Sequence, residues 1–458
     1  MKKHITFALL FAAALTAQAQ QGGISGEMLN QIKQSYKATP ADKAIRNALG
    51  GTSINTLALN QENRADFDTE FSHKVLSKGI TDQQSSGRCW LFTGLNVLRS
   101  QMIAKYGLDE MEFSQNYCFF YDQLEKANLF LQGIIDTSGK PMDDKMVEWL
   151  FKHPLSDGGQ FTGVSDIIEK YGLVPKSAMV ETFSSENTGK MSSLIGLKLK
   201  EFGLQLREAA ATGAQPAELE KKKTEMLGTV YRMLVLTLGE PVSTFTWSLK
   251  GGEAKEYTPV SFYKEFLGND LTNNYVMLMN DPSREFYKCY EIDFDRHRYD
   301  GKNWTYVNLP IEDIKEIAIA SIKDSTMMYF SCDVGKFLDS KRGLLDPDNY
   351  DYESLMGTTF GMDKKQRIQT FSSGSSHAMT LMAVDLDKAG KPKKWMVENS
   401  WGSASGYRGH LIMTDKWFDE YMFRVVAEKK YVPAKVLDIL KQKPICLPAW
   451  DPMFADEE

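Results

Sequence analysis

The sequence predicts an α+β fold in which helices come first and mainly antiparallel strands follow. Three observations support this prediction. Residues 89–105 carry apolar side chains at gaps of four, three and four, which is the spacing of one helical stripe. Residues 190–239 contain two amphipathic stretches separated by "ATGAQP", which indicates a helical hairpin. From about residue 256 the chain changes to short strand-like runs such as "CYEIDF" and "WTYVNL".

The first twenty residues, "MKKHITFALLFAAALTAQAQ", are typical of a secretory signal peptide. Two lysines precede an apolar run from Ile5 to Leu15, and "AQA" at 17–19 supplies the small residues that a signal peptidase reads. A short buried helix is the alternative, but it does not explain charge, apolar run and cleavage site in that order. We expect cleavage after Ala19 and export to the periplasm or the extracellular space. No other apolar stretch is long enough to span a bilayer, so we expect no membrane association.

The remaining segments follow in order. Residues 20–60 are polar with a few helical signals, and we expect them to form an arm on the main body. The helix over 89–105 places Cys89 in its first turn. A second helix is expected at 143–152, then a turn at "DGGQ" (157–160) and a helix that stops at Gly172. The last third of the chain has strand candidates at 378–385, 394–398 and 409–413.

Composition narrows the class of protein. Hydrophobic residues make up 42% of the 458 residues and charged residues 25%, which is ordinary for a globular chain. The formal charge of −6 makes nucleic acid an unexpected partner. The five cysteines are irregularly spaced and form no C-x-x-C pair, so we expect neither a metal nor a redox site.

Cys89 is the first candidate for chemistry. A thiol becomes a good nucleophile when its thiolate is stabilised, and unsatisfied N–H groups at a helix start do this. Arg88 adds positive charge if it does not simply face solvent. A cysteine beside Trp90 and Leu91 is also often just part of the core, so Cys89 alone leaves both interpretations open.

A base and an orienting group are candidates further along the chain. His377 opens a predicted strand after the polar run "SSGSS", whereas His73 and His297 lie in polar surroundings and are expected on the surface. Asn399, in "ENSWG", lies 22 residues beyond His377 at a strand end and offers an acceptor that would fix the imidazole ring. Trp401 would shield that hydrogen bond from water.

Together these stretches resemble the papain-like cysteine proteases. "Q-x-x-x-G-x-C-W" from Gln83 to Trp90, then "S-H-A", then "E-N-S-W-G" occur in the order of that pattern. The resemblance implies that Cys89 is the nucleophile, His377 the base and Asn399 its orienter. It also implies that the amide of Gln83 binds the developing oxyanion, beside the backbone N–H of Cys89.

The match extends to one family within that group. "TDQQSSGRCWLF", "FSQNYCFFYDQLEKAN", "DGGQF", "IIEKYGLVPK", "MNDP" and "LPAWDPM" resemble the bleomycin hydrolase, or aminopeptidase C, family from about residue 25 to the end. The resemblance implies a papain-like two-lobed cysteine peptidase fold with helical insertions and an N-terminal arm. The expected segments are a signal peptide (1–19), the arm (20–60), a helical lobe with the nucleophile (61–189), a helical insertion (190–255), a mixed insertion (256–350), a β-rich lobe with His377 and Asn399 (351–445) and a C-terminal tail (446–458).

The family resemblance also implies details of the site. Gly158 and Gly159 match the strip where the substrate backbone binds, and no cofactor is expected. The tail would enter the cleft and pair its carboxylate with the substrate's amino group. The resemblance also implies a homohexameric ring whose active sites face an inner channel. This chain ends Phe454-Ala455-Asp456-Glu457-Glu458, where the family usually ends in small apolar residues. Two anchors therefore remain open: the terminal carboxylate of Glu458, or the side chain of Asp456, Glu457 or Glu458. Ser86 stands where the papain signature has a disulfide cysteine, so we expect few or no disulfides.

The sequence therefore predicts an exported thiol aminopeptidase that acts on peptides through a cysteine thioester, with the tail limiting the cleft. One alternative is an endopeptidase of the same fold with an open cleft. A less favoured alternative is a non-catalytic ring that binds peptides, and the intact set of Gln83, Cys89, His377 and Asn399 argues against it.

Overall fold

A computed structural model describes residues 22–63 and 68–453, which divide into two compact units. The expected signal peptide (1–19) lies outside the described residues. Among the described residues, the first unit consists of 22–59 together with 351–358. Its helices are α1 (Gly26–Ser35), α2 (Pro40–Leu49), α3 (Ile54–Ala58) and α14 (Tyr352–Met356).

The first unit contains the segment expected as an N-terminal arm, and it adds a short piece expected in the β-rich lobe. Its first three helices each begin after a Ser or Thr whose side chain accepts a backbone N–H, namely Ser25, Thr39 and Ser53. The Tyr352 hydroxyl donates to Asn55 at 3.0 Å, which joins α14 to α3. Few of its residues are buried, so capping and local pairs rather than a core define these helices.

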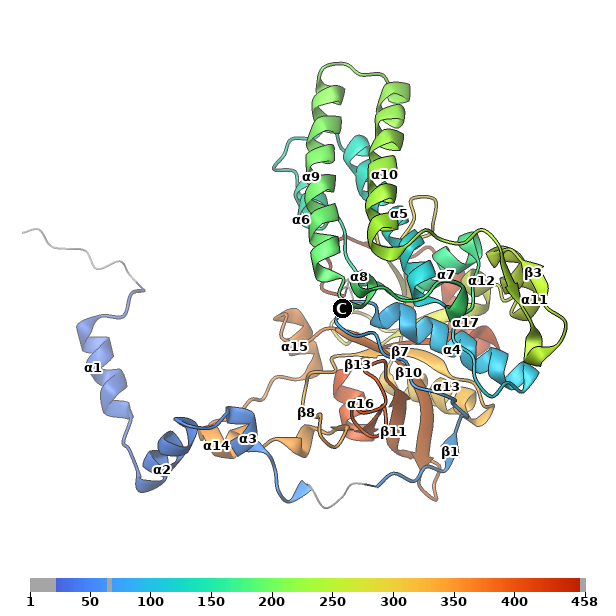
Figure 1. Ribbon diagram of the computed structural model, residues 1–458. Coiled ribbons are helices and arrows are strands. Elements are labelled where there is room, and N and C mark those ends of the chain that lie inside the picture. Colours follow the sequence, from blue (N-terminus) through green and yellow to red (C-terminus); the bar gives the residue numbers. More distant parts are fainter. Residues whose placement is uncertain (1–21, 64–67, 454–458) are drawn as a thin grey trace, which may run out of the picture. The chain divides into compact units, whose positions relative to one another are not determined.

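Most helices of the second unit precede its main sheet strands in the sequence, and a smaller group lies between those strands. Those in the first half are α4 (Cys89–Tyr106), α5 (Gln115–Asp136), α6 (Lys145–Lys152), α7 (Phe161–Tyr171), α8 (Phe183–Glu186), α9 (Gly189–Ala211), α10 (Pro216–Leu238), α11 (Pro259–Phe266) and α12 (Leu271–Asn274). Those in the second half are α13 (Ile311–Lys323), α15 (Lys364–Gln369), α16 (Asp415–Tyr421) and α17 (Ala434–Leu437). In Figure 1 the green pair α9 and α10 stands out as a long hairpin, as the sequence predicts.

The helix α4 differs from its predicted form in one respect. The apolar spacing predicts one buried stripe, but every residue from Cys89 to Arg99 is buried. The reason is that α4 lies between α5 and α7 on one side and the strands β7 and β10 on the other. A helix enclosed on all sides makes a rigid platform for the residue at its start.

Twelve strands of the described chain form one sheet, in the order β14-β5-β6-β4-β13-β7-β10-β11-β12-β9-β8, with β1 paired to β10. Their bounds are β1 (His73–Lys74), β4 (Tyr275–Met279), β5 (Lys288–Ile292), β6 (Thr305–Asn308), β7 (Met328–Cys332), β8 (Leu338–Asp339), β9 (Leu344–Leu345), β10 (His377–Leu386), β11 (Pro392–Glu398), β12 (His410–Thr414), β13 (Met422–Glu428) and β14 (Ile445–Leu447). A separate hairpin pairs β2 (Phe245–Trp247) with β3 (Lys255–Tyr257).

The sheet is mainly antiparallel, with three parallel pairs, β4–β6, β5–β14 and β9–β12. The segment 256–350, expected as a mixed insertion, supplies six strands, β4 to β9, to the same sheet that carries His377. It is therefore part of the β-rich lobe rather than a separate insertion. The strand-like runs of 256–350 are visible in the sequence, but several of their partners are distant in the chain, since β4 and β7 pair with β13 and β5 pairs with β14.

Two hydrophobic clusters give the second unit its two lobes. One contains α4, α5, α7 and the α9–α10 hairpin, and Cys89 belongs to it. The other lies between the sheet and the helices α13 and α16. Because α4 packs directly on β10, the helix that begins at Cys89 and the strand that begins at His377 meet between the two lobes. Within residues 22–63 and 68–453, no helix combines the length and apolar character needed to cross a membrane.

Candidate active site

Cys89 is the first residue of α4 and is fully buried. The residue before it, Arg88, is the N-cap, and no side chain caps this helix. The Arg88 carbonyl accepts the backbone N–H groups of Leu91 and Phe92, both at 3.0 Å. No side chain therefore competes for the start of this helix, and the helix dipole favours negative charge near the Cys89 thiol.

His377 begins β10 and is held by Asn399, which follows β11. His377 Nε2 lies 2.8 Å from Asn399 Oδ1, and both side chains are buried. The backbone N–H of Ser400 donates to the same oxygen at 2.8 Å, which identifies that atom as the amide oxygen. Nε2 must then be the donating ring nitrogen, so Nδ1 is the nitrogen that can accept a proton in the neutral ring.

Trp401 covers this pair, as the sequence predicts. Its ring lies 4.7 Å from the His377 ring, centroid to centroid, with an interplanar angle of 30°. The backbone of residues 400–402 pairs with that of residues 81–83, because Gln83 N donates to Ser400 O and Gly402 N donates to Thr81 O. The segment that carries Asn399 and Trp401 is thus joined to the segment that precedes Cys89.

Gln83 is fixed at both ends of its side chain. Its Nε2 donates to the Ser86 carbonyl at 2.7 Å, and its Oε1 accepts from the Ser400 hydroxyl at 2.6 Å. One amide hydrogen is therefore engaged by Ser86, and the second hydrogen on Nε2 remains as a donor. Ser400, which the sequence analysis did not single out, sets the orientation of both Asn399 and Gln83.

Gly158 and Gly159 lie beside Trp90, the residue after Cys89. The Trp90 indole N–H donates to the Asp157 carbonyl at 2.8 Å, which ties α4 to this turn. A Cβ on Gly159 would lie 2.3 Å from Cε1 of His297 and 2.9 Å from Cδ2 of Trp90. Glycine is therefore required at 159 by the packing beneath it, in addition to the close approach of a substrate that the sequence analysis considered.

His297 is not on the surface, contrary to the sequence-based expectation. It is 4% exposed, its ring lies 4.8 Å from the Trp90 ring, and its Nδ1 lies 2.5 Å from Asp122 Oδ1. Burial alone would raise the pKa of Asp122, but the charges of Lys126 and His297 hold it below its usual value. The residues next to His297 in the sequence are polar, which suggests exposure, but its ring packs against Trp90 and the turn at Gly159.

A cavity of about 330 Å³ lies next to the segment that leads into that turn. Its lining includes Lys126, Trp149, His153, Ser156 and His297. Lys126 also donates to the carbonyls of Ser156 and Gly158, so the wall of the cavity and the turn share a cation. Cys89, Gln83, His377 and Asn399 are not among the lining residues.

The described part of the tail runs back towards the histidine strand. Asp451 pairs with Arg284, and the Met453 carbonyl accepts from Arg424 on β13. A Cβ on Gly374, three residues before His377, would lie 3.9 Å from the Pro452 carbonyl oxygen. Glu458, expected as a substrate-binding residue, lies outside the described residues, as do Asp456 and Glu457.

All five cysteines lie among the described residues, and none forms a disulfide. Burial, followed by the charge of Glu291, raises the pKa of Cys289 to about 11. Burial also raises the pKa of Cys118, with a further contribution from Asp122. No group of three or more metal-ligating side chains occurs within residues 22–63 and 68–453.

Comparison with known proteins supports the relationship. Residues 23–454 match the model of the Peptidase C1-like family. The chain is 37% identical over 449 residues to bleomycin hydrolase of Mus musculus, covering 94% of this chain and 98% of the relative. It is 36% identical over 440 residues to aminopeptidase C of Listeria monocytogenes, covering 94% of this chain and 99% of the relative.

A solved structure agrees over nearly the same length. The crystal structure of PepW from Lactobacillus rhamnosis HN001 superimposes with a TM-score of 0.90 at 36% identity, covering 95% of this chain and all of that one. The fold is thus the papain-like α+β fold with helical insertions, as the sequence predicts. The chain belongs to the Peptidase C1-like family, the bleomycin hydrolase and aminopeptidase C family of papain-like cysteine peptidases.

Proposed function

We propose that this protein is a thiol aminopeptidase whose nucleophile is Cys89. The thiolate attacks the carbonyl carbon of the first peptide bond, and a carbon–sulfur bond forms. His377 gives a proton from Nδ1 to the leaving amine as the carbon–nitrogen bond breaks, which leaves a thioester. Water then attacks the thioester carbonyl, and His377 takes a proton from that water. The carbon–sulfur bond breaks, the amino acid leaves, and the thiolate–imidazolium pair is restored.

Two groups stabilise the charge on the carbonyl oxygen during these steps. The backbone N–H of Cys89 donates to the oxyanion, and so does the second hydrogen on Gln83 Nε2. Both donors are held in place before the substrate arrives, the first by α4 and the second by Ser86 and Ser400. A preorganised pair of donors does not have to reorient as the charge develops.

The observation that carries the proposal is the state of His377. A buried imidazole with Nε2–H donating to Asn399, covered by Trp401, keeps its tautomer and ring position without help from water. It stands at the start of a strand against which the Cys89 helix packs. A fixed tautomer and ring position let Nδ1 accept and donate a proton, as catalysis requires. A histidine that only fills space does not require either.

We further propose that the acidic tail limits the cleft to substrates with a free amino end. Support comes from the contacts of residues 451–453 with Arg284 and Arg424. Arg424 is in register with Ser331 on β7, and Ser331 with Ala378 on β10, so this anchor lies two strands, or about 10 Å, from the start of the histidine strand. The names of the relatives, aminopeptidase C among them, are consistent with this specificity.

Export and assembly are also proposals. The N-terminal pattern of charge, apolar run and small residues supports cleavage after Ala19 and export. The mass of the purified protein tests the cleavage. The family resemblance supports a homohexameric ring, which sedimentation or light scattering tests directly.

The decisive experiment compares a short peptide that has a free amino terminus with its N-acetylated twin. We expect turnover of the free-amine peptide and at least a hundredfold lower kcat/KM for the acetylated one. Equal turnover of both would replace the aminopeptidase with an endopeptidase of the same fold. Absence of turnover of either peptide by the reduced enzyme would contradict the catalytic proposal itself.

A further inference from the structure

Arg88 lies directly before the nucleophile, yet the mechanism above gives it no task. Its side chain is fully buried. The guanidinium carbon lies 5.1 Å from the centre of the Phe92 ring and 5.4 Å from that of Phe119. A buried arginine is costly unless its donors are matched to fixed acceptors, so its contacts indicate what it holds.

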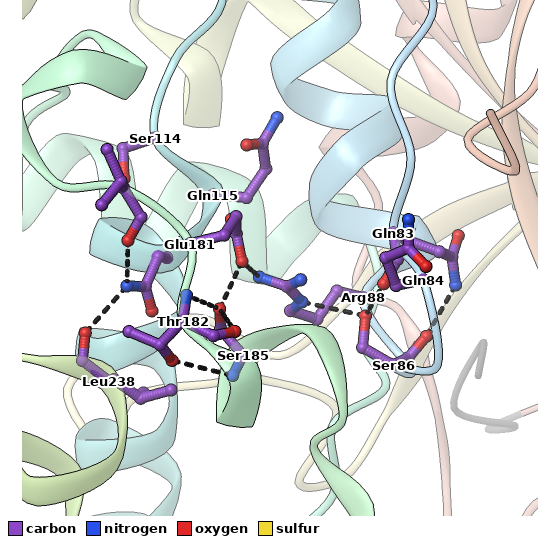
Figure 2. A network of polar contacts seen from close by, with 12 residues as sticks. Gln83, Gln84, Ser86, Arg88, Ser114, Gln115, Glu181, Thr182, Ser185 and Leu238 are labelled. Atoms are coloured by element: carbon purple, nitrogen blue, oxygen red, sulfur yellow. Dashed lines mark hydrogen bonds and ion pairs between the residues drawn. The ribbon is translucent and has the colours of Figure 1, made fainter. Parts of the chain in front are cut away.

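The contacts of Arg88 point in two directions (Figure 2). Nη1 pairs with Glu181 Oε2 at 2.8 Å, and Nε donates to the Ser86 hydroxyl oxygen at 3.0 Å. Burial lowers the pKa of Arg88, and the charge of Glu181 opposes that shift. Arginine remains charged at any pH at which the protein is folded.

On one side, the contacts lead through Ser86 to Gln83, whose amide is the proposed oxyanion donor. The Ser86 hydroxyl accepts from Arg88 and donates to the Gln83 carbonyl at 2.6 Å. The Ser86 carbonyl in turn accepts from Gln83 Nε2 at 2.7 Å. Both the backbone and the side-chain amide of Gln83 are therefore held by one residue, and Arg88 fixes the hydroxyl of that residue.

On the other side, the contacts lead to a firm anchor. The Ser185 hydroxyl donates to the same Glu181 oxygen at 2.5 Å. The neighbouring carbonyl of Val180 accepts from Asn116 Nδ2 of α5, which also donates to Leu238 O at the end of α10. Figure 2 shows this part of the network between the start of α5 and the last turn of α10. Glu181 thus sits on backbone that two long helices fix.

We propose that Arg88 is a positioning residue for the oxyanion site: anchored on Glu181, it orients Ser86, and through Ser86 it holds the amide of Gln83. This inference rests on the proposed function, because it assigns Arg88 to the peptide-cleaving step. Arg88 does not touch the substrate in this role. It acts by keeping Gln83 Nε2 where negative charge will develop.

The test separates positioning of the oxyanion donor from activation of the thiol. Arg88→Met keeps an apolar stem beside Phe92 and Phe119 but removes both hydrogen bonds. Peptide turnover develops an oxyanion, whereas alkylation of Cys89 by iodoacetamide does not. We expect kcat on the free-amine peptide to fall about 10²-fold with KM changed little, similar to loss of one oxyanion donor. The alkylation rate of Cys89, followed by mass spectrometry, should stay within about twofold of wild type.

Two further variants guard against a simple folding defect. Ser86→Ala leaves the Arg88–Glu181 pair intact and removes only the hydroxyl that joins Arg88 Nε to the Gln83 carbonyl, so it should reproduce the loss in kcat. Lys315→Met removes another buried cation, which lies on α13 and pairs with Asp415 and Asp419 of α16. It should lower the melting temperature without the loss in kcat.

A double-mutant cycle completes the experiment. If Arg88 acts through Gln83, the combination Arg88→Met with Gln83→Ala should be no slower than Gln83→Ala alone. Losses that multiply, or an alkylation rate that falls in proportion to turnover, would overturn the inference. Failure of wild type to cleave the peptide, with Cys89→Ala as blank, would instead reject the proposed function.

Discussion

Cys89 and Cys118 are both fully buried cysteines near the start of a long helix, yet their surroundings differ. Cys89 is the first residue of α4, whose first turn has no side-chain cap. Cys118 lies one turn into α5, where Ser114 caps the helix by accepting the N–H of Tyr117 at 3.0 Å. Asp122, one turn further on, adds a negative charge that raises the pKa of Cys118 beyond the effect of burial.

The comparison shows that burial does not decide whether a cysteine is reactive. Burial by itself favours the neutral thiol in both places. What distinguishes Cys89 is its place at the first residue of a helix without a side-chain cap, and the histidine strand that packs against that helix. Composition and exposure alone would have ranked the two residues equally.

The largest expected effect comes from replacing each of the two cysteines in turn. Cys89→Ala should lower turnover of a free-amine peptide by at least about 10⁴-fold, because no other group forms the thioester. Cys118→Ala should keep a kcat near that of wild type. Its free energy of unfolding should fall by at most about 1 kcal/mol, as small core changes usually cause. Peptide kinetics and thermal melts measure both. Comparable loss of turnover in the two variants would refute the distinction.

The next effect concerns the histidine that makes the first cysteine different. Asn399→Ala removes the acceptor at His377 Nε2, so the ring loses its fixed tautomer and kcat should fall about 10²-fold. Asn96→Ala is the matched control, since Asn96 is a buried asparagine of α4 whose amide donates to the Thr81 hydroxyl at 3.0 Å. Equal losses in both variants would mean that packing rather than orientation matters.

Chemical labelling sharpens the contrast among the thiols. At pH 8, iodoacetamide should label Cys89 and the exposed Cys446 of the folded enzyme. Cys118 and Cys289 should stay unlabelled, because burial raises the pKa of both thiols. In urea all five cysteines should react. Peptide mass mapping gives the result, and labelling of Cys118 as fast as of Cys89 would contradict it.

A smaller effect follows from the pKa of Cys289, which burial raises to about 11. In the unfolded chain this thiol loses its proton near pH 8.5, so between about pH 9 and 11 the folded state binds more protons. Its contribution to stability is therefore complete below pH 8.5 and is lost as the pH rises through 11. The free energy of unfolding should fall less steeply over this range in Cys289→Ala than in wild type, as urea titrations at several pH values would show. Parallel curves would mean that Cys289 does not contribute.

The smallest effect tests the cap that distinguishes the second helix. Ser114→Ala should lower the free energy of unfolding by about 1 kcal/mol, because the N–H of Tyr117 loses its acceptor. Peptide kcat should not change, since Cys118 takes no part in the reaction. Denaturant curves and kinetics on the same sample decide it, and a loss of kcat without a loss of stability would contradict the assignment.

The sequence predicted the parts of the site that depend on local pattern. Cys89, His377 and Asn399 each stand at the end of a helix or strand that periodicity reveals, and their chemistry identifies them. Arg88 remained without a role because its partner Glu181 is 93 residues away. His297 was misplaced because its local letters are polar, while its partner Asp122 is 175 residues away. Such pairings come from tertiary packing, which a single sequence does not display.

The fold shows the same limit. The helix at 89–105 and the hairpin at 190–239 were predictable because each has its own apolar spacing. The strands within 256–350 were visible as short runs, but not their place in the sheet beside β13 and β10. Sheet order depends on which distant strand is available as a neighbour, and the alternation of side chains along one strand does not specify it.

The segment from Gln83 to Arg88 is held by a charged pair and a serine, and none of the five cysteines forms a cross-link. The redox state of the surroundings therefore cannot loosen this fold through a reduced disulfide. Within the site it acts on the thiol of Cys89, whose oxidation to a sulfenic acid a reductant reverses. In an oxidising compartment such an enzyme would be switched off at its nucleophile while its scaffold stayed intact, and restored by a small thiol.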